Sequence, residues 1–234
     1  MFIVDCLIAN VITKFTASPD KLNKLIYRLS LTEYAIANHC RKLAGELDPN
    51  LIPPDPHHTH HSDNQLAQFL WEQYIEERLH GQMLAALLHE PSHKQGGIGQ
   101  VKHPDFIAKQ VEGLSNISPF WWLLGGKRAE DFELCDRLAM MSVLEDYSRK
   151  FYECLFHVLP NCPLRRLADK ISVEEIEHSE ALFSYLSQMV GRYKARWLIL
   201  KWKVKALLVL PDALRLGLAY AQNNKKEIKH DAVI

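Results

Sequence analysis

The chain has 234 residues, of which 47% are hydrophobic and 24% are charged, an ordinary balance for a soluble globular protein. The 28 basic and 28 acidic side chains cancel, so the total charge gives no reason to expect a nucleic-acid-binding protein. The five cysteines are odd in number and lack C-x-x-C spacing, which argues against a disulfide framework. The length suits a single domain over 1–234 that can bury a sizeable core.

Neither end of the chain indicates export or membrane insertion. Residues 1–15 form an apolar segment, but they lack a basic region, and Asp5 interrupts the apolar run. No stretch reaches the roughly 20 uncharged residues that a membrane-spanning helix needs. The extension 210–234 ends in a polar tail that we expect to fray. These features predict a cytoplasmic protein.

Four long helices are expected in a core over about 19–209. Ser18-Pro19 is a typical start for the first, about 19–47, and Ser62 or Asp63 for the second, about 63–89. The remaining helices are expected at about 129–158, from Ser172 to about 209, and at 212–222, and no segment predicts a strand.

Two segments between the helices are less regular. Residues 91–117 have little periodicity, which suits a long crossover in a four-helix bundle or a lid over a site. The aromatic segment 118–128 follows them. The histidine-rich run 57–61 lies among prolines and is interpreted as an exposed linker, although it could bind a soft metal.

The chemistry-bearing pattern is a repeated E-E-x-x-H motif. Glu77 and His80 stand three residues apart on the second helix, as do Glu175 and His178 on the fourth. This spacing puts each carboxylate and imidazole on one helix face, where they can grip a metal ion together. Two such helices that face each other can therefore hold two ions.

Each of the other two helices offers one carboxylate on its apolar stripe. Glu33 lies among Leu29 and Ile36, and Glu145 follows Met141 by four residues. Such a carboxylate is costly to bury unless it is paired or ligates a metal. Glu133 and Glu153 fit less well, since each aligns with an arginine and should be solvated.

The resulting ligand set contains four carboxylates and two imidazoles, with Glu77 and Glu175 bridging. This donor set suits two iron ions, or manganese, better than structural zinc. The same six residues are the candidate catalytic residues: Glu33, Glu77, His80, Glu145, Glu175 and His178.

The order Glu, Glu-x-x-His, Glu, Glu-x-x-His over about 19–190 resembles the ferritin-like diiron-carboxylate superfamily. The resemblance implies an all-α, ferritin-like four-helix bundle with a long crossover between its second and third helices and extra terminal helices. It also implies a dioxygen-activating oxidase or hydroxylase. Known members hydroxylate isoprenoid quinones, a modified transfer RNA base or acyl chains, and nothing in the sequence selects among these.

Several of these residues have simpler interpretations. Ser172-x-x-Glu175 is also a capping box, in which Glu175 would satisfy a helix N-terminus. Glu77 and His80 could form a surface pair. The other glutamates of the two motifs, Glu76, Glu174 and Glu177, are expected to be solvated, and the nearby tyrosines are expected to pack in the core: Tyr34, Tyr74 and Tyr152.

The C-terminal stretch 191–215 is basic, aromatic and strongly apolar. It contains seven basic residues and one acid, Asp212. We expect the end of the fourth helix to pack across the bundle with its lysines reaching water. Peripheral contact with an anionic membrane is the alternative, and contact with nucleic acid is less well supported.

The leading functional hypothesis is a diiron oxidase or monooxygenase with a hydrophobic, lipid-like substrate, held near the helix faces 33–40 and 141–148. An external electron donor is expected, because the chain has neither a Rossmann glycine fingerprint nor an iron–sulfur cysteine set. A ferroxidase or other iron-handling protein is the second hypothesis, and it predicts a large oligomer rather than a monomer or homodimer. A metal-free ferritin-like binding module is the third.

Overall fold

The computed structural model describes the backbone of residues 2–51, 64–88 and 127–208, with side chains from residue 8 onward. Over these ranges the chain forms six α-helices and no strand, as the sequence predicts. The predictions made for 57–61, 91–117 and 212–222 lie outside the described residues.

The N-terminal half supplies three of the helices. α1 (Phe2–Thr16) occupies the apolar N-terminal segment and packs against α2 (Pro19–Leu47), whose bounds agree with the prediction. A single 3-10 turn, Pro49–Leu51, follows. α3 (Gln65–Leu87) is capped by Asn64, whose side chain accepts a hydrogen bond from the backbone N–H of Ala67 at 3.2 Å.

The third and fourth predicted helices differ from expectation at their ends. Residues Ala129–Asp131 form a separate 3-10 turn, and α6 (Leu134–Val158) begins only after it. α7 (Pro163–Val190) begins well before Ser172, with Cys162 at the N-cap position. Proline is favoured in the first helical turn because its missing N–H would have no partner there. The predicted start at Ser172 is therefore wrong.

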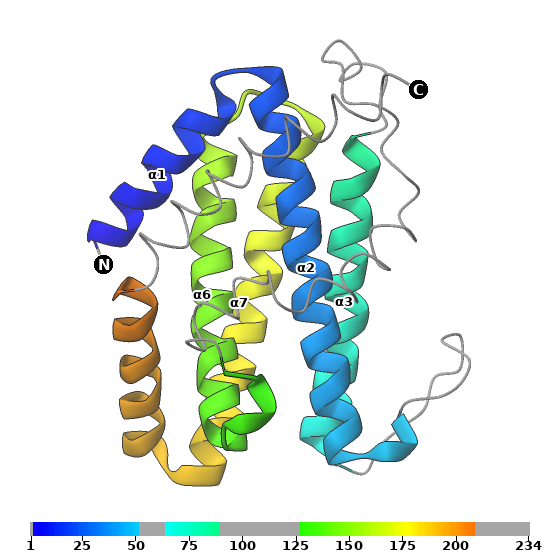
Figure 1. Ribbon diagram of the computed structural model, residues 1–234, viewed down its shortest axis with the longest axis vertical. Coiled ribbons are helices and arrows are strands. Elements are labelled where there is room, and N and C mark those ends of the chain that lie inside the picture. Colours follow the sequence, from blue (N-terminus) through cyan, green and yellow to red (C-terminus); the bar gives the residue numbers. More distant parts are fainter. Residues whose placement is uncertain (1, 52–63, 89–126, 209–234) are drawn as a thin grey trace.

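The fourth helix also does not continue to residue 209. It ends at Val190, and Gly191 has a φ of 82°, a conformation that glycine adopts without steric cost. A new helix covers 192–208 and lies beside α6 (Figure 1). The Trp202 indole donates a hydrogen bond to Asp136 of α6 at 2.9 Å and meets the Phe132 ring.

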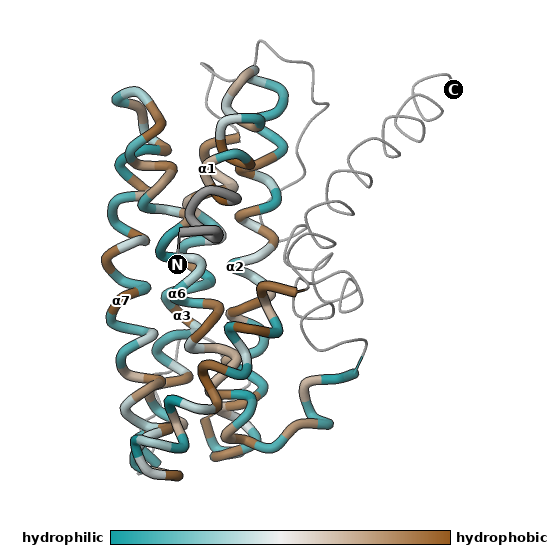
Figure 2. The backbone as a smooth tube through the Cα atoms, turned by 90° about the vertical axis from the view of Figure 1, so that its left-hand side faces the viewer, coloured by the Kyte–Doolittle hydropathy of each residue, from teal (hydrophilic) through white to brown (hydrophobic). Residues whose placement is uncertain are grey.

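The four long helices form two antiparallel pairs, α2 with α3 and α6 with α7 (Figure 1). α3 ends at the opposite end of the bundle from the start of α6, so these two helices run in the same direction. This arrangement agrees with the crossover expected between them. The pairs face each other, and Figure 2 shows hydrophobic and hydrophilic residues alternating along the helices, as in amphipathic helices around a shared core.

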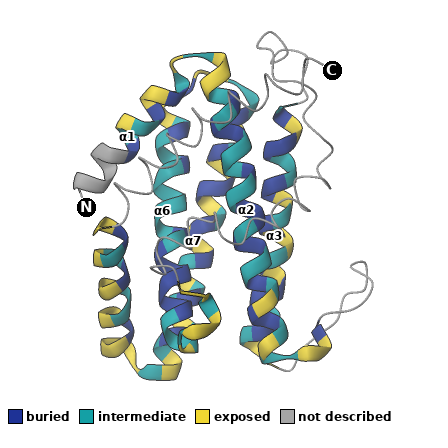
Figure 3. Cartoon of the chain, in the orientation of Figure 1, coloured by how far each residue is buried: buried dark blue, intermediate teal, exposed yellow. Residues whose placement is uncertain are grey.

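Buried residues run along all four long helices (Figure 3). Besides a small cluster of Tyr34 and Ala85, the core consists of two large apolar clusters, one toward each end of the bundle. One contains Leu43, Leu70 and Leu186, and the other contains Ile26 and Leu155. Between them lies a layer of buried polar side chains, to which all four long helices contribute. Among the described residues, no helix is both long and apolar enough to cross a membrane.

Candidate metal centre

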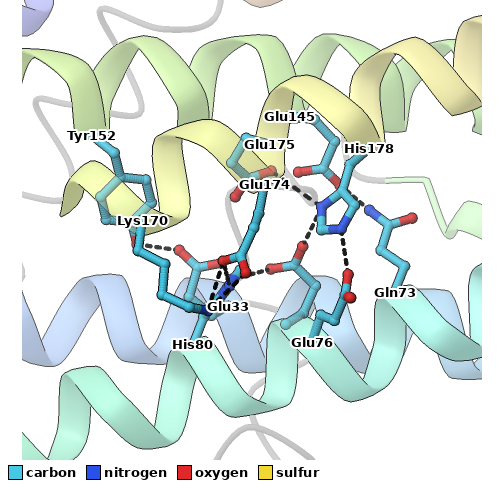
Figure 4. Close-up of polar contacts among 11 residues, drawn as sticks. Glu33, Gln73, Glu76, His80, Glu145, Tyr152, Lys170, Glu174, Glu175 and His178 are labelled. Carbon is cyan, nitrogen blue, oxygen red and sulfur yellow. Dashed lines mark hydrogen bonds and ion pairs between the residues drawn. The ribbon is translucent and has the colours of Figure 1, made fainter. Parts of the chain in front are cut away.

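The polar layer contains all six residues predicted as metal ligands. α2 and α6 contribute one carboxylate each, and α3 and α7 each contribute a carboxylate and an imidazole (Figure 4). All six residues are at most 4% exposed: Glu33, Glu77, His80, Glu145, Glu175 and His178.

The six residues form two overlapping groups of four. In each group, one donor atom from every member lies within 4.8 Å of the others. Glu77 and Glu175 belong to both groups. Glu33 and His80 complete the first, while Glu145 and His178 complete the second. Two adjacent cation positions that share two carboxylates are the arrangement expected of a dinuclear centre.

Each imidazole is oriented by a carboxylate from the opposite helix. The Nε2 atom of His80 lies 2.9 Å from Glu174 of α7, and that of His178 lies 2.8 Å from Glu76 of α3. A carboxylate can only accept, so Nε2–H is the donor in each contact. This fixes Nδ1 as the atom that faces the cluster, 3.4 Å from Glu77 in His80 and 3.1 Å in His178.

The pKa values of the two orienting carboxylates agree with this assignment. The hydrogen bond from His178 lowers the pKa of Glu76, despite its partial burial. Burial opposes ionisation of Glu174, but hydrogen bonds from Lys170, at 2.7 and 2.9 Å, and from His80 keep its pKa below the usual value. Both groups are therefore ionised at neutral pH. Glu76 and Glu177 are exposed as expected, whereas Glu174 is only partly exposed. The contacts of Glu76 and Glu174 with the buried imidazoles were not expected.

Two further buried residues hold the terminal carboxylates. The Tyr152 hydroxyl of α6 donates a hydrogen bond to Glu33 of α2. Gln73 of α3 donates from Nε2 to Glu145 of α6 at 2.6 Å. Tyr152 and Gln73 are each 1% exposed, so both contacts are shielded from water. Each joins one helical pair to the other across the polar layer.

Burial and mutual repulsion disfavour charge on the four carboxylates of the cluster. Burial and the neighbouring Glu77 raise the pKa of Glu33 well above its usual range, and burial with Glu175 does the same for Glu145. The pKa of Glu77 is raised by burial and by Glu145, and that of Glu175 is raised to about 7 by burial and by Glu77. A bound cation would relieve both effects.

His178 lies in the negative field of this cluster. Burial opposes its protonated form, but contacts with Glu175, Glu76 and Glu77 outweigh burial and raise its pKa. The clustered carboxylates thus favour a positive charge at this position. The same field favours a metal ion in place of that proton.

The donor atoms themselves fit a metal. Both oxygens of Glu77 and Glu175, one oxygen each of Glu33 and Glu145, and Nδ1 of both histidines are buried without a hydrogen-bond partner. Unpartnered buried polar atoms are rare in folded proteins and call for an explanation. Each of these atoms belongs to a member of the two ligand groups, so ligation of two cations would account for them.

The structure also decides between the simpler interpretations. Ser172 lies in the interior of α7, where its hydroxyl donates to the backbone oxygen of Asp169 at 2.8 Å, so it caps no helix. The capping-box interpretation of Glu175 is therefore wrong. A surface pair of Glu77 with His80 is excluded as well, because the two side chains are 0% and 1% exposed.

The remaining charged and aromatic candidates do not belong to either ligand group. Glu153 pairs with Arg149 as expected, whereas Arg137 pairs with Glu46 of α2, at 2.6 Å, rather than with Glu133. Of the nearby tyrosines, Tyr34 is buried against Gly81, and Tyr74 packs against the core with its ring tilted by 48° to that of Trp71, so both pack as the sequence predicts. Tyr152 also packs in the core, and its hydroxyl is satisfied by a candidate ligand, Glu33.

Sequence reasoning missed the orienting residues Gln73, Glu76 and Glu174, although a signal for them exists. Glu76 lies four residues before His80, Glu174 lies four before His178, and Gln73 lies four before Glu77. At this spacing each shares a helix face with a candidate ligand. Only the packing of α3 on α7 and α6 shows which ligand each residue contacts.

Comparison of the chain with protein-family models, with curated proteins and with solved structures gives no match. The metal-site interpretation therefore rests on the geometry of these residues.

Proposed function

We propose that this protein is a non-haem diiron enzyme with a ferritin-like fold, which uses dioxygen to oxidise a hydrophobic organic substrate. The observation that carries the proposal is the pair of overlapping ligand groups that share Glu77 and Glu175. Two antiparallel helical pairs with parallel α3 and α6 support the ferritin-like assignment.

The donor set favours iron or manganese over softer metals. Four carboxylates and two imidazoles offer hard oxygen and nitrogen ligands, and four carboxylates balance the charge of two divalent cations. Cys40 lies nearby and is fully buried. Burial, followed by the charges of Glu145, Glu77 and Glu175, raises the pKa of its thiol well above the usual value. Cys40 belongs to neither ligand group, so the donor groups found in the described residues contain no thiolate.

The residues divide into ligands and groups that position them. Glu33 and His80 would hold one ion, Glu145 and His178 the other, and Glu77 with Glu175 would bridge both. Glu174 and Glu76 set the ring orientation and tautomer of the histidines, and their negative charge makes Nδ1 more basic. Tyr152 and Gln73 hold the terminal carboxylates in place.

Two reduced iron ions, when bound, would supply electrons for the reduction of dioxygen. The protein would exclude water from this reaction, because buried apolar side chains of α2 and α6 lie next to the ligands, among them Ile36, Ala37 and Met141. We propose that the substrate binds on this side, along 33–40 and 141–148. The electrons would come from a separate donor protein.

Metal content and spectroscopy test the proposal. Protein purified from iron-replete cells should contain about two iron ions per chain, and dioxygen added to the Fe(II) form should produce an oxo-bridge absorption. At a metal concentration about 100 times Kd, binding should stabilise the fold by roughly 2.7 kcal/mol. Glu77→Ala should abolish the absorption and this stabilisation. The exposed Glu72 on the same helix provides the matched control, Glu72→Ala.

The same measurements separate the alternatives. If neither iron nor manganese is found, and Glu77→Ala changes neither metal content nor stability, the metal centre is ruled out and a metal-free binding module is left. Sustained Fe(II) oxidation without organic substrate, by a protein that elutes as a large oligomer, would indicate a ferroxidase instead. Elution as a monomer or homodimer supports the oxidase.

A further inference from the structure

Helix 192–208 carries a continuous apolar stripe that is open to solvent. Its members recur at spacings of three and four residues, so they line one face of the helix. Tyr193 is 81% exposed, Trp197 60% and Leu208 75%. The complete stripe comprises Tyr193, Trp197, Leu200, Val204, Leu207 and Leu208.

The opposite face of helix 192–208 packs against the bundle. Ala195, Trp202 and Ala206 are buried within the core cluster that includes the first turns of α6. The hydrogen bond between Trp202 and Asp136 fixes the rotation of the helix about its axis. The stripe therefore points away from α6, as the outward yellow side of this helix shows in Figure 3. It cannot turn inward without breaking those contacts.

Basic residues border the stripe on both sides. The segment 192–208 contains six lysines and arginines and no acidic residue. Helical spacing places three of them along each edge: Lys194, Lys201 and Lys205 on one, and Arg192, Arg196 and Lys203 on the other. Lys201 and Lys203 also pair with Asp136 and Asp146 of α6, at 2.7 and 2.8 Å. Lys194 and Arg196 are exposed and form no ion pair within the described part of the chain.

These charges decide what can cover the stripe. A second copy of the helix would fit the spacing, since alternating steps of three and four residues form a coiled-coil seam. In such a dimer, however, the basic rows of the two copies would face each other, and their repulsion disfavours self-association. The stripe instead requires a partner that offers apolar contact in the middle and negative charge on both sides.

We propose that helix 192–208 docks the protein on the surface of an anionic phospholipid bilayer. The stripe would enter the boundary between headgroups and acyl chains, with Tyr193 and Trp197 at the depth that such side chains prefer. Lys194 on one edge, and Arg192 and Arg196 on the other, are exposed and would contact anionic headgroups. The helix lies at the outer side of α6 among the described helices (Figure 1), and the stripe residues and Lys194, Arg192 and Arg196 are all exposed. A single acidic protein helix would cover a narrower strip.

Co-sedimentation of the full-length protein with lipid vesicles tests this proposal. The protein should bind vesicles that contain phosphatidylglycerol, bind pure phosphatidylcholine vesicles much more weakly, and dissociate as salt rises. Lys194→Glu combined with Arg196→Glu should weaken binding at least about tenfold. Lys14→Glu combined with Lys21→Glu, at exposed positions on α1 and α2, should have a smaller effect. Leu200→Ser with Val204→Ser should also reduce binding at least about tenfold.

Two results would overturn the proposal. Absence of binding to any vesicle would exclude a membrane surface. If the protein is then dimeric and Leu200→Ser with Val204→Ser makes it monomeric, the stripe is a seam between two copies. If those substitutions instead lower the unfolding temperature of a monomer, another part of the chain covers the stripe. Binding that these substitutions leave unchanged would assign membrane contact elsewhere. None of these substitutions touches the candidate ligands, so the result is independent of the proposed diiron function.

Discussion

At the scale of single residues, the site depends on positioning groups as much as on ligands. Each histidine is held by a carboxylate from the other EExxH helix, so the two motifs orient each other. Glu76 and Glu174 are partly exposed, at 53% and 30%, yet each fixes a buried imidazole. Substituting one of them should therefore affect metal binding without removing any ligand.

Glu76→Gln and Glu174→Gln should each weaken iron or manganese binding by about 10–100-fold, because the imidazole loses its charged partner. The affinity can be measured by competition with a chelator. Glu177→Gln serves as the matched control on α7, since Glu177 is exposed. Equal affinities for all three variants would show that these hydrogen bonds do not orient the histidines.

At the scale of secondary structure, the start of α7 determines what Glu175 can do. A helix that begins at Pro163 places Glu175 more than two turns inside, where its backbone groups are already paired. Its carboxylate is therefore available to the cluster. A helix that began at Ser172 would have used this carboxylate as part of a cap.

Ser172→Ala should change the free energy of unfolding by less than about 0.5 kcal/mol, because the hydroxyl only bonds back within the helix. Asn64→Ala should cost about 1 kcal/mol, since Asn64 caps α3. Urea denaturation of both variants checks the contrast. A larger loss for Ser172→Ala than for Asn64→Ala would restore the capping interpretation.

α2 and α3 pack closely together beside the candidate metal centre. A Cβ atom added to Gly81 would lie 3.1 Å from the Tyr34 ring and 3.3 Å from the backbone oxygen of Ser30. The Ser30 hydroxyl also donates to the backbone oxygen of Gly81 at 2.9 Å, which holds the two helices at this separation.

Gly81→Ala should push the two helices apart and destabilise the protein by about 1–3 kcal/mol, despite the better helix propensity of alanine. It should also weaken metal binding, because His80 adjoins it in sequence and Glu33 lies on the displaced helix. Thermal unfolding and metal titration measure the two effects. Unchanged stability would show that Tyr34 moves aside without cost.

At the scale of the whole molecule, stability depends on pH through groups outside the metal site as well. Burial, followed by the positive charge of Arg137, lowers the pKa of His39 from 6.5 to about 4. Between these values the unfolded chain binds a proton at this site that the folded protein does not. The contribution of His39 to stability is thus fully present above about pH 6.5 and is lost as the pH falls toward 4.

His39→Gln removes this titration. We expect the variant to lose less stability than the parent between about pH 7 and about pH 5, as measured by urea denaturation at both values. The other acid-sensitive groups are common to both proteins and cancel in the comparison. Parallel losses in the two proteins would show that His39 titrates equally in the folded and unfolded states.

The sequence alone determined the helical class, three of the four long helices to within a few residues, and six buried residues that the structure brings together. These features could be predicted because amphipathic periodicity is a local property of the sequence. In addition, a carboxylate on an apolar stripe needs a compensating partner in any fold. Glu33 and Glu145 were found in this way, although they come from different helical pairs.

Tertiary structure decided where α7 begins and which residues contact one another across helices, since local sequence patterns do not determine either. Cys162-Pro163 and Ser172 are both acceptable helix starts, and only the first lets the whole length of α7 bury its apolar face against α6. The partners of Gln73, Glu76 and Glu174 lie 72 to 102 positions away in sequence. Such contacts depend on how the helices pack, and no local propensity encodes them.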